Sequence, residues 1–307
     1  QAAGPALVMD PNSTIVIDAG WSATRLPEGT LKLSRTEALE TAVADTALDP
    51  IRLELFNKRF MSVAEQMGLA LERTAHSVNI KERLDFSCAV FDADGGLVAN
   101  APHMPVHLGS MSASVRAAAD AHPDLKAGDA VAVNAPYDGG THLPDITLVT
   151  PVHDETTGER IFYVASRGHH ADVGGIAPGS MPPFSTSIEQ EGVQFRNIKI
   201  MTGGKFLEAE TRAVLASKPW PARNPDQNIA DLKAQLAACA KGADELRRLV
   251  DDNGLEVVKA YMGHVQDNAE RAVRRVIDAL SDGEHSVKLD DGAEIRVAIR
   301  VNRAERS

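Results

Sequence analysis

The sequence predicts an α+β protein: a mixed, largely antiparallel sheet flanked by helices, with a long antiparallel helical hairpin over residues 225–280. Three observations support this fold class. Short apolar runs separated by tight turns recur between residues 79 and 170, which is typical of strands joined as hairpins. One helical stripe of apolar residues follows Asp49. Two further stripes fill the region 225–280.

The composition is that of an ordinary globular protein and excludes some partners. The chain has 307 residues, 43% of them apolar and 24% charged, with a formal net charge of −11. This negative charge argues against nucleic acid or an anionic membrane as partner. Two isolated cysteines, Cys88 and Cys239, favour a reducing cytoplasm over a disulfide scaffold. The first residue is Gln rather than Met, so we expect an excised or processed piece.

Residues 1–35 form short β-type runs split by turns, the first of them at Asp10-Pro11-Asn12. They predict a small β meander that must pack on something else, because it is too short to bury a core. Residues 36–48 are polar and rich in Ala, which predicts a linker. At Asp49-Pro50 a long helix begins, since Asp is a favoured N-cap and Pro suits the first helical position.

A β-hairpin is expected next, with strands at 86–91 and 97–100. Glu82 arrives just before its first strand. The Pro-rich loop 101–109 carries His103 and His107 ahead of a helix over 110–121, and we count His107 among the candidate catalytic residues. The segments 179–184 and 190–192 read as a loop that either covers a pocket or simply connects.

Two helices are expected to fill the region 225–280. The first begins at Asn224-Pro225 and ends at Asn253-Gly254. The apolar spacing predicts that the two helices pack along a coiled-coil-like seam that includes Cys239. A final β-hairpin is expected over 287–301.

The densest chemistry lies in the stretch 134–175. A Gly-rich turn delivers His142 and, three residues later, Asp145. Two apolar segments joined by a polar turn follow, and the second ends in His169, His170 and Asp172. A hairpin brings these strand ends together in space, so we predict a site of metal ligands or proton-transfer groups there.

Imidazole and carboxylate side chains suit Mn, Fe or Zn better than Ca or Mg. Neighbouring strand residues point to opposite faces, so only one of His169 and His170 can easily be a ligand, and which one stays open. Asp172 is a candidate to orient a ligand imidazole, and Glu82 to act as a fourth ligand or general base. A G-x-S-x-G elbow, a P-loop and a G-x-G-x-x-G turn after a strand are all absent from the sequence.

The long motifs resemble the hydantoinase B/oxoprolinase family. They are DPIRLELFNKRFMSVAEQMG (49–68), NIKERLDFSCAVF (79–91), NAPHMPVHLG (100–109), GGTHLPDITLVTPV (139–152), FYVASRGHHADVGGIAPGSMPP (162–183), QEGV (190–193) and AYMGH (260–264). The closest resemblance is to ATP-dependent 5-oxoprolinases. Residues 1–35 resemble the closing β segment of the A-type, ATP-using domain that is fused upstream in such enzymes.

The resemblance implies opening of the lactam of 5-oxo-L-proline to L-glutamate, driven by ATP cleavage. It implies a divalent metal, Mn or Zn, held by Glu82, His142, Asp145 and either His169 or His170. ATP with Mg would bind in the A-type domain upstream. We therefore expect the tail of an A-type domain (1–35), a linker (36–48) and a B-type domain (49–307) truncated at its C-terminus and inactive alone.

Other functions are kept open. An N-methylhydantoinase or a ketone carboxylase of the same family would use different substrates. A structural or interaction fragment would use the helical hairpin as a dimer surface, with the histidines as ordinary polar packing. Besides the A-type domain we expect a lactam substrate and further copies of the chain as partners, and neither nucleic acid nor membrane.

Overall fold

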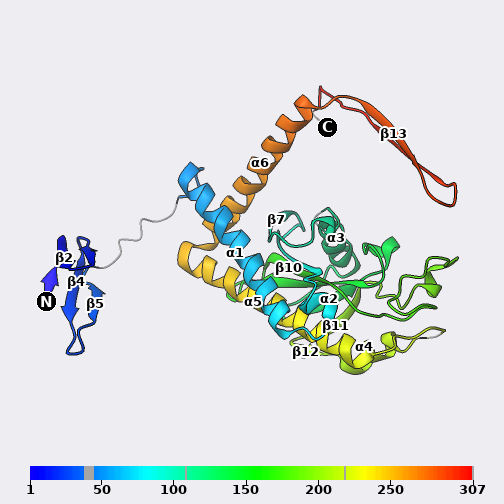
Figure 1. Ribbon diagram of the computed structural model, residues 1–307, viewed down its shortest axis with the longest axis horizontal. Coiled ribbons are helices and arrows are strands. Elements are labelled where there is room, and N and C mark those ends of the chain that lie inside the picture. Colours follow the sequence, from blue (N-terminus) through cyan, green and yellow to red (C-terminus); the bar gives the residue numbers. More distant parts are fainter. Residues whose placement is uncertain (38–44, 108, 218, 306–307) are drawn as a thin grey trace. The chain divides into compact units, whose positions relative to one another are not determined.

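The computed structural model describes residues 1–37, 45–107, 109–217 and 219–305 (Figure 1). The chain divides into two compact units, Gln1–Asp45 and Thr46–Ser307. The matched motifs and every candidate site residue belong to the second unit. The predicted linker, 36–48, lies largely outside the described residues.

The first unit contains the short strands that the sequence predicts, but they form two sheets rather than one meander. Asp10 and Ser13 close a tight turn between two strands that form a hairpin of their own. A three-stranded antiparallel sheet accounts for the other strands. The buried apolar side chains that the structure describes in this unit are Ile17 of the hairpin and Ala23 of the three-stranded sheet, so the core of the unit is small. The strands are β1 (Ala2–Ala3), β2 (Ala6–Asp10), β3 (Ser13–Ile17), β4 (Trp21–Arg25) and β5 (Leu31–Arg35).

The second unit is built on a seven-stranded sheet in the order β12-β11-β8-β9-β10-β6-β7, which confirms the predicted α+β class. Every pairing in it is antiparallel. Its strands are β6 (Phe86–Asp92), β7 (Leu97–Asn100), β8 (Ala130–Val133), β9 (Asp145–His153), β10 (Arg160–His169), β11 (Ile198–Thr202) and β12 (Lys205–Phe206). The short helix α2 (Val78–Lys81) precedes these strands and α4 (Glu208–Leu215) follows them. Between the strands lie the single turns η1 (Pro105–His107), η2 (Pro136–Asp138) and η3 (Ile188–Gln190).

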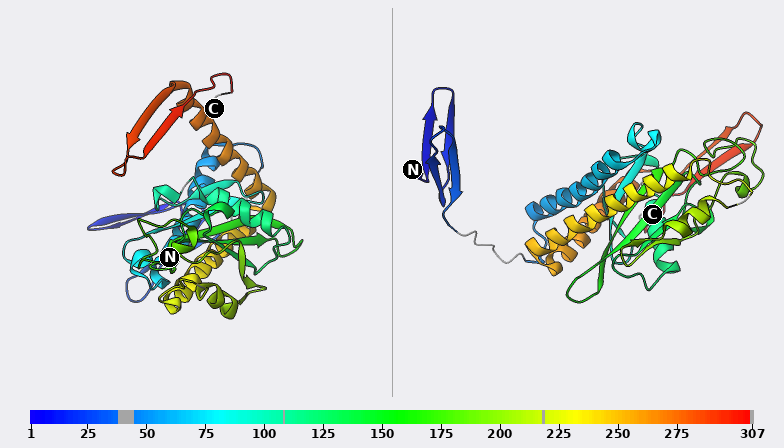
Figure 2. Two further views of the ribbon diagram at one scale, coloured as in Figure 1. Left: turned by 90° about the vertical axis from the view of Figure 1, so that its right-hand side faces the viewer. Right: turned by 90° about the horizontal axis from the view of Figure 1, so that it is seen from below.

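Helices cover both faces of this sheet (Figure 1). On one face α3 (Met111–Ala121) packs over a cluster that includes Phe91, Val149 and Tyr163. The opposite face receives α1 (Pro50–Thr74) and α5 (Pro225–Asn253), which lie side by side (Figure 2). Because strand residues alternate between faces, each strand contributes to both layers.

The long helix α1 begins as its sequence predicts. The Asp49 side chain accepts the backbone N–H of Arg52 at 2.8 Å, and Pro50 is the first helical residue. The apolar stripe is buried, including Met67, which confirms its place in the core. A methyl group added at Gly242 of α5 would lie 2.4 Å from the Met67 sulfur, so α1 and α5 cross closely at this glycine.

Helices α5 and α6 (Leu255–Ala279) confirm the predicted helical pair, joined at Gly254. The expected seam between them is wrong in detail. The apolar stripe of α5 packs mainly against α1 and the sheet, where Cys239 lies 3.4 Å from the Ser166 hydroxyl. Figure 1 shows α6 leading away from α5, and its side chains from Asp267 onward are largely exposed.

The final hairpin, β13 (Gly283–Lys288) and β14 (Glu294–Ile299), is also present, and all its residues are exposed. Its register places Val287 opposite Ile295 and His285 opposite Val297 on one side. Charged side chains such as Glu284 lie on the other.

The candidate site lies where several connections reach one edge of the sheet. Asp145 begins β9, His169 ends β10, and the two residues are direct register partners. The loop after Asn100 and the loop before Ile198 arrive at the same edge. The polar side chains of the candidate site therefore gather at this end of β9 and β10.

Candidate metal centre

Two rows of polar side chains cross the sheet on the face covered by α3. The first row runs from Asp85 through His169 to Asp145, since the His169 N–H donates to the Asp85 carbonyl at 3.0 Å. The second row runs from Ser87 through Arg167 to Thr147, two residues along each strand. Beyond it the same face becomes the apolar cluster under α3.

His142, Asp145 and His169 form a triad whose potential ligand atoms all lie within 4.8 Å of one another. Nδ1 of His169 is 3.0 Å from Oδ1 of Asp145 and 3.3 Å from Nε2 of His142. Nδ1 of His142 is 3.4 Å from the other carboxylate oxygen, Oδ2. The sequence prediction that these three residues converge agrees with this geometry.

A tight turn delivers His142 to the triad. Gly139 has φ 98°, a left-handed conformation that favours glycine. A methyl group at Gly140 would lie 2.1 Å from the Asn134 carbonyl oxygen, so only glycine fits against that backbone. The buried Asn134 side chain then donates to the Leu143 carbonyl at 2.7 Å and accepts the Phe195 N–H at 2.6 Å, which fastens the turn to the loop before β11.

Asp145 is buried and surrounded by histidines. Besides its contacts within the triad, its Oδ2 lies 3.1 Å from Nε2 of His107. Burial alone raises the pKa of the Asp145 carboxyl, but the hydrogen bonds from His107 and His169 outweigh it and hold this pKa well below its usual range. Asp145 is therefore an anion at neutral pH.

His142 is the most exposed member of the triad, with 44% of its side chain accessible compared with 14% for His169. Burial lowers the pKa of the His142 imidazole, and the nearby Asp145 carboxylate only partly offsets this. The ring is therefore neutral at pH 7, as a metal-ligating imidazole must be.

Arg167 stands directly behind the triad and is fully buried. Its guanidinium donates to three hydroxyls: Thr147 at 2.7 Å, Ser110 at 2.5 Å and Ser114 at 2.8 Å. Burial lowers its pKa and the Asp145 carboxylate opposes that effect, but an arginine stays charged in proteins. The positive charge of Arg167 thus lies in the row next to the one that contains Asp85 and Asp145.

His170 points away from the triad, to the α5 face of the sheet. Nε2 lies 3.1 Å from Oε1 of Gln235, and Nδ1 lies 3.1 Å from Nδ2 of Asn228. The Gln235 amide also donates to the carbonyls of Ile146 and Ser166, so its oxygen must accept from His170. Both ring nitrogens of His170 are therefore occupied by protein groups.

Asp172 lies outside the triad as well. Its carboxylate accepts the N–H groups of Gly174, Gly179 and Arg223 and pairs with the Arg223 guanidinium at 2.7 Å. These bonds lower the pKa of Asp172 against the opposing effect of burial. Asp172 thus stabilises the loop that follows β10 by binding Gly174 and Gly179 within it and Arg223 beside it.

The structure does not bring Glu82 to the triad. Glu82 is exposed at the C-terminal end of α2. Asp85, three residues later, instead has its Oδ2 3.7 Å from Nδ1 of His169. Asp85, Ser87 and Arg167 were not among the site residues predicted from the sequence. The alternation of side chains along a strand could have predicted Asp85 and Ser87, because residues two apart point to the same face of the sheet.

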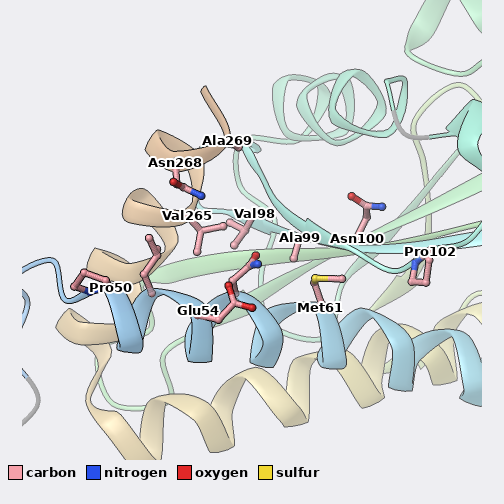
Figure 3. A pocket seen from close by; sticks show the side chains of 12 residues that line it. Pro50, Glu54, Met61, Val98, Ala99, Asn100, Pro102, Val265, Asn268 and Ala269 are labelled. Carbon is pink, nitrogen blue, oxygen red and sulfur yellow. The ribbon is translucent and has the colours of Figure 1, made fainter. Parts of the chain in front are cut away.

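A separate cavity of about 470 Å³ lies between α1, β7 and α6 (Figure 3). Asn57 and Met61 of α1, Asn100 of β7 and Asn268 of α6 are among its lining residues. The lining shares no residue with the triad, so this cavity is not part of the candidate metal centre.

Two further findings bear on the sequence predictions. Cys88 and Cys239 are both free and buried, and burial raises the pKa of each thiol. Among the described residues, no helix has the length and apolar character needed to cross a membrane.

The chain matches the hydantoinase B/oxoprolinase family over residues 49–306. It is 45% identical to a 5-oxoprolinase of Dictyostelium discoideum over 315 residues, which cover 99% of this chain and 24% of that protein. It is 45% identical to 5-oxoprolinase 1 of Arabidopsis thaliana, with 91% of this chain and 23% of that protein covered. The chain thus spans about a quarter of the length of these curated relatives.

Two solved structures share the fold. The ATP-dependent caprolactamase from Pseudomonas jessenii aligns with a TM-score of 0.73 and 28% identity, over 83% of this chain and 45% of that one. A nucleotide-free acetone carboxylase aligns with a TM-score of 0.69 and 19% identity, over 78% of this chain and 31% of that one. The second likeness extends to the fold alone.

Proposed function

Because the chain belongs to the hydantoinase B/oxoprolinase family, we propose that it is the lactam-hydrolysing part of an ATP-dependent 5-oxoprolinase. The substrate is then 5-oxo-L-proline and the product L-glutamate. The observation that carries the proposal is the triad of His142, Asp145 and His169 at the edge of the sheet. The identity to 5-oxoprolinases along almost the whole chain supports the choice of substrate.

The triad has the donor set of a transition-metal site. Two imidazoles and one ionised carboxylate suit Mn²⁺ or Zn²⁺, which take nitrogen and oxygen ligands together. Asp85, beside His169, supplies the fourth ligand that the resemblance assigned to Glu82. Of the two candidate histidines we assign His169 as the ligand, because both ring nitrogens of His170 contact Gln235 and Asn228 of α5.

A divalent cation at such a site polarises a carbonyl and lowers the pKa of a bound water. The residues of this chain supply the rest. Asp145 stays ionised inside the fold because its two oxygens accept hydrogen bonds from histidines. Arg167 adds a permanent positive charge, buried on the same face of the sheet as Asp145. His142 is the most exposed of the three ligands and so the one most accessible to a substrate.

The same proposal assigns the ATP site, with its Mg²⁺, to an A-type domain fused upstream in the complete enzyme. The relatives are about four times as long as the matched region, which leaves room for such a domain. We assign the enzyme to the cytoplasm, since both cysteines are free thiols, and expect it to form homo-oligomers.

The test is glutamate formation from 5-oxo-L-proline and ATP by the complete enzyme. His142→Ala and Asp145→Ala should abolish it, while His285→Ala, on the exposed final hairpin, should leave it unchanged. Wild-type turnover in both triad variants would show that the site lies elsewhere. Turnover of N-methylhydantoin, or of acetone with bicarbonate, in place of 5-oxo-L-proline would reassign the substrate.

Metal analysis distinguishes the enzyme from a purely structural fragment. The chain purified without added metal should contain Mn or Zn, or bind either in a 1:1 ratio. A chain that holds no metal and gains none when Mn²⁺ or Zn²⁺ is added would support the structural alternative.

A further inference from the structure

The two oxygens of Asp145 have different surroundings. Oδ1 lies 3.0 Å from Nδ1 of His169, and Oδ2 lies 3.4 Å from Nδ1 of His142. Oδ2 lies 3.1 Å from Nε2 of His107, which is itself buried and 2% exposed. His107 reaches Asp145 from the loop before α3, so this contact joins the carboxylate to an element outside the hairpin that carries it.

The hydrogen-bond network assigns the proton positions on His107. An ionised Asp145 can only accept, so Nε2 of His107 carries a proton and donates it. The other ring nitrogen, Nδ1, lies 2.9 Å from the Ser87 hydroxyl. With the proton on Nε2, a neutral imidazole leaves Nδ1 free to accept from the Ser87 hydroxyl, which also lies 3.5 Å from the Met104 carbonyl oxygen. The chain of donors runs from Ser87 through His107 to Asp145.

Hydrogen bonds link the loop that carries His107 to the start of α3 and to β10. The Ser110 hydroxyl donates to the His107 carbonyl at 3.1 Å. Arg167 in turn donates to the same hydroxyl. These two bonds link the loop that carries His107 to β10, the strand that ends in His169.

We propose that His107 is a positioning residue: it binds Oδ2 of Asp145 and so fixes the orientation of the carboxylate towards the cation, and Ser87 fixes the tautomer that His107 needs. The role rests on the proposed metal centre. Outer partners of this kind orient a ligating carboxylate, and their removal usually weakens metal binding by about 10- to 100-fold. This replaces the direct catalytic role expected from the sequence, because His107 touches Asp145 and Ser87 rather than an open site.

Two substitutions of His107 separate this role from simple packing. In His107→Gln the amide nitrogen takes the place of Nε2 and keeps a donor for Asp145. In His107→Asn the amide group takes the place of Nδ1, so that it reaches Ser87 and leaves Oδ2 of Asp145 without its donor. The two variants remove the same ring and differ in which contact remains.

The measurement is a calorimetric titration of the 307-residue chain with Mn²⁺, with thermal unfolding of the metal-free chain as the control for folding. We expect His107→Asn to weaken Mn²⁺ binding by about 10- to 100-fold and His107→Gln by less than about threefold. Equal Mn²⁺ affinities in the two variants would overturn the role of His107 and leave the metal centre standing. A wild-type chain that binds neither Mn²⁺ nor Zn²⁺ would overturn both.

Ser87→Ala provides a second measurement that does not depend on either His107 variant folding. It removes only the donor to Nδ1 and leaves the ring in place. We expect a loss of about three- to tenfold in Mn²⁺ affinity, smaller than for His107→Asn, because the ring can still donate to Asp145. An unchanged affinity would contradict the part assigned to Ser87, and an unchanged affinity together with two unfolded His107 variants would overturn the proposal.

Discussion

The carboxylate of Asp85 lies 3.7 Å from Nδ1 of His169, and the His169 N–H donates to the Asp85 carbonyl oxygen at 3.0 Å. These contacts join the approach to β6 with the end of β10. Asp85 and Asp145 therefore stand on either side of His169, on neighbouring strands of one sheet. Glu82 remains exposed on α2, although it precedes Asp85 by only three residues.

Asp85→Asn should weaken Mn²⁺ binding by at least about tenfold, because the change removes a charged oxygen ligand while preserving the side-chain shape. Glu82→Gln is the matched control and should leave the Mn²⁺ affinity unchanged. Calorimetric titration of both variants decides between them. The reverse pattern, with Glu82→Gln the weaker binder, would restore Glu82 as the ligand.

Substitutions of His169 and His170 should have different effects, the first on metal binding and the second on stability. His169→Ala should weaken Mn²⁺ binding by about 100-fold or more, because it deletes a ligand. His170→Ala should keep metal binding but lower the free energy of unfolding by about 2–4 kcal/mol, since Gln235 and Asn228 lose a buried partner. Urea unfolding and Mn²⁺ titration measure the two effects. Loss of Mn²⁺ binding in a stable His170→Ala chain would contradict this division.

Arg167→Lys should destabilise the chain by about 1–3 kcal/mol, because a single ammonium group cannot reach the three hydroxyls that the guanidinium binds. Arg248→Lys is the control: its side chain is 69% exposed and pairs with Glu245, so the cost should stay below about 1 kcal/mol. Urea denaturation of both variants provides the comparison. Similar costs at the two positions would show that the buried hydroxyl contacts add nothing.

The sequence predicted the centre of the site because its cues there are local. Gly139 and Gly140 mark the turn that presents His142, and the hairpin follows from two apolar segments. The alternation of side chains along a strand predicts that His169 and His170 point to opposite faces of the sheet, but it does not say which of them joins His142 and Asp145. That answer depends on α5, which supplies Gln235 and Asn228 from more than fifty residues away in sequence.

Other features depended on tertiary contacts and could not be predicted. Arg167 sits in an apolar strand and is buried only because Ser110 and Ser114 of the α3 region surround its guanidinium. The choice between Glu82 and Asp85 depends on where α2 ends. The seam expected between α5 and α6 failed because the same apolar spacing also suits packing on α1 and the sheet.

Acid should destabilise the chain partly through His103. Burial lowers the pKa of this imidazole to about 4, and the nearby His107 adds to the effect. The unfolded chain therefore binds this proton more readily than the folded chain between pH 6.5 and 4. The contribution to stability is complete above pH 6.5, falls as the pH drops towards 4, and is constant below.

His103→Asn tests this prediction, since its amide oxygen can still accept the Cys88 N–H that Nδ1 of His103 accepts at 3.1 Å. The ring is partly exposed, so solvent screening reduces the full linkage effect, and we expect about 1–2 kcal/mol. Urea unfolding at pH 7 and pH 4.5 should show a smaller loss of stability in the variant than in the wild type. Equal losses would remove His103 from the acid response.

Gly140→Ala should damage both the fold and the metal centre. A methyl group there would lie 2.1 Å from the Asn134 carbonyl oxygen, so the turn that carries His142 must shift. We expect a loss of about 1–3 kcal/mol in the free energy of unfolding together with weaker Mn²⁺ binding. Gly263→Ala, inside α6 with open space around it, should instead stabilise the chain by about 0.5–1 kcal/mol. Wild-type Mn²⁺ affinity in Gly140→Ala would show that the position of His142 does not depend on this turn.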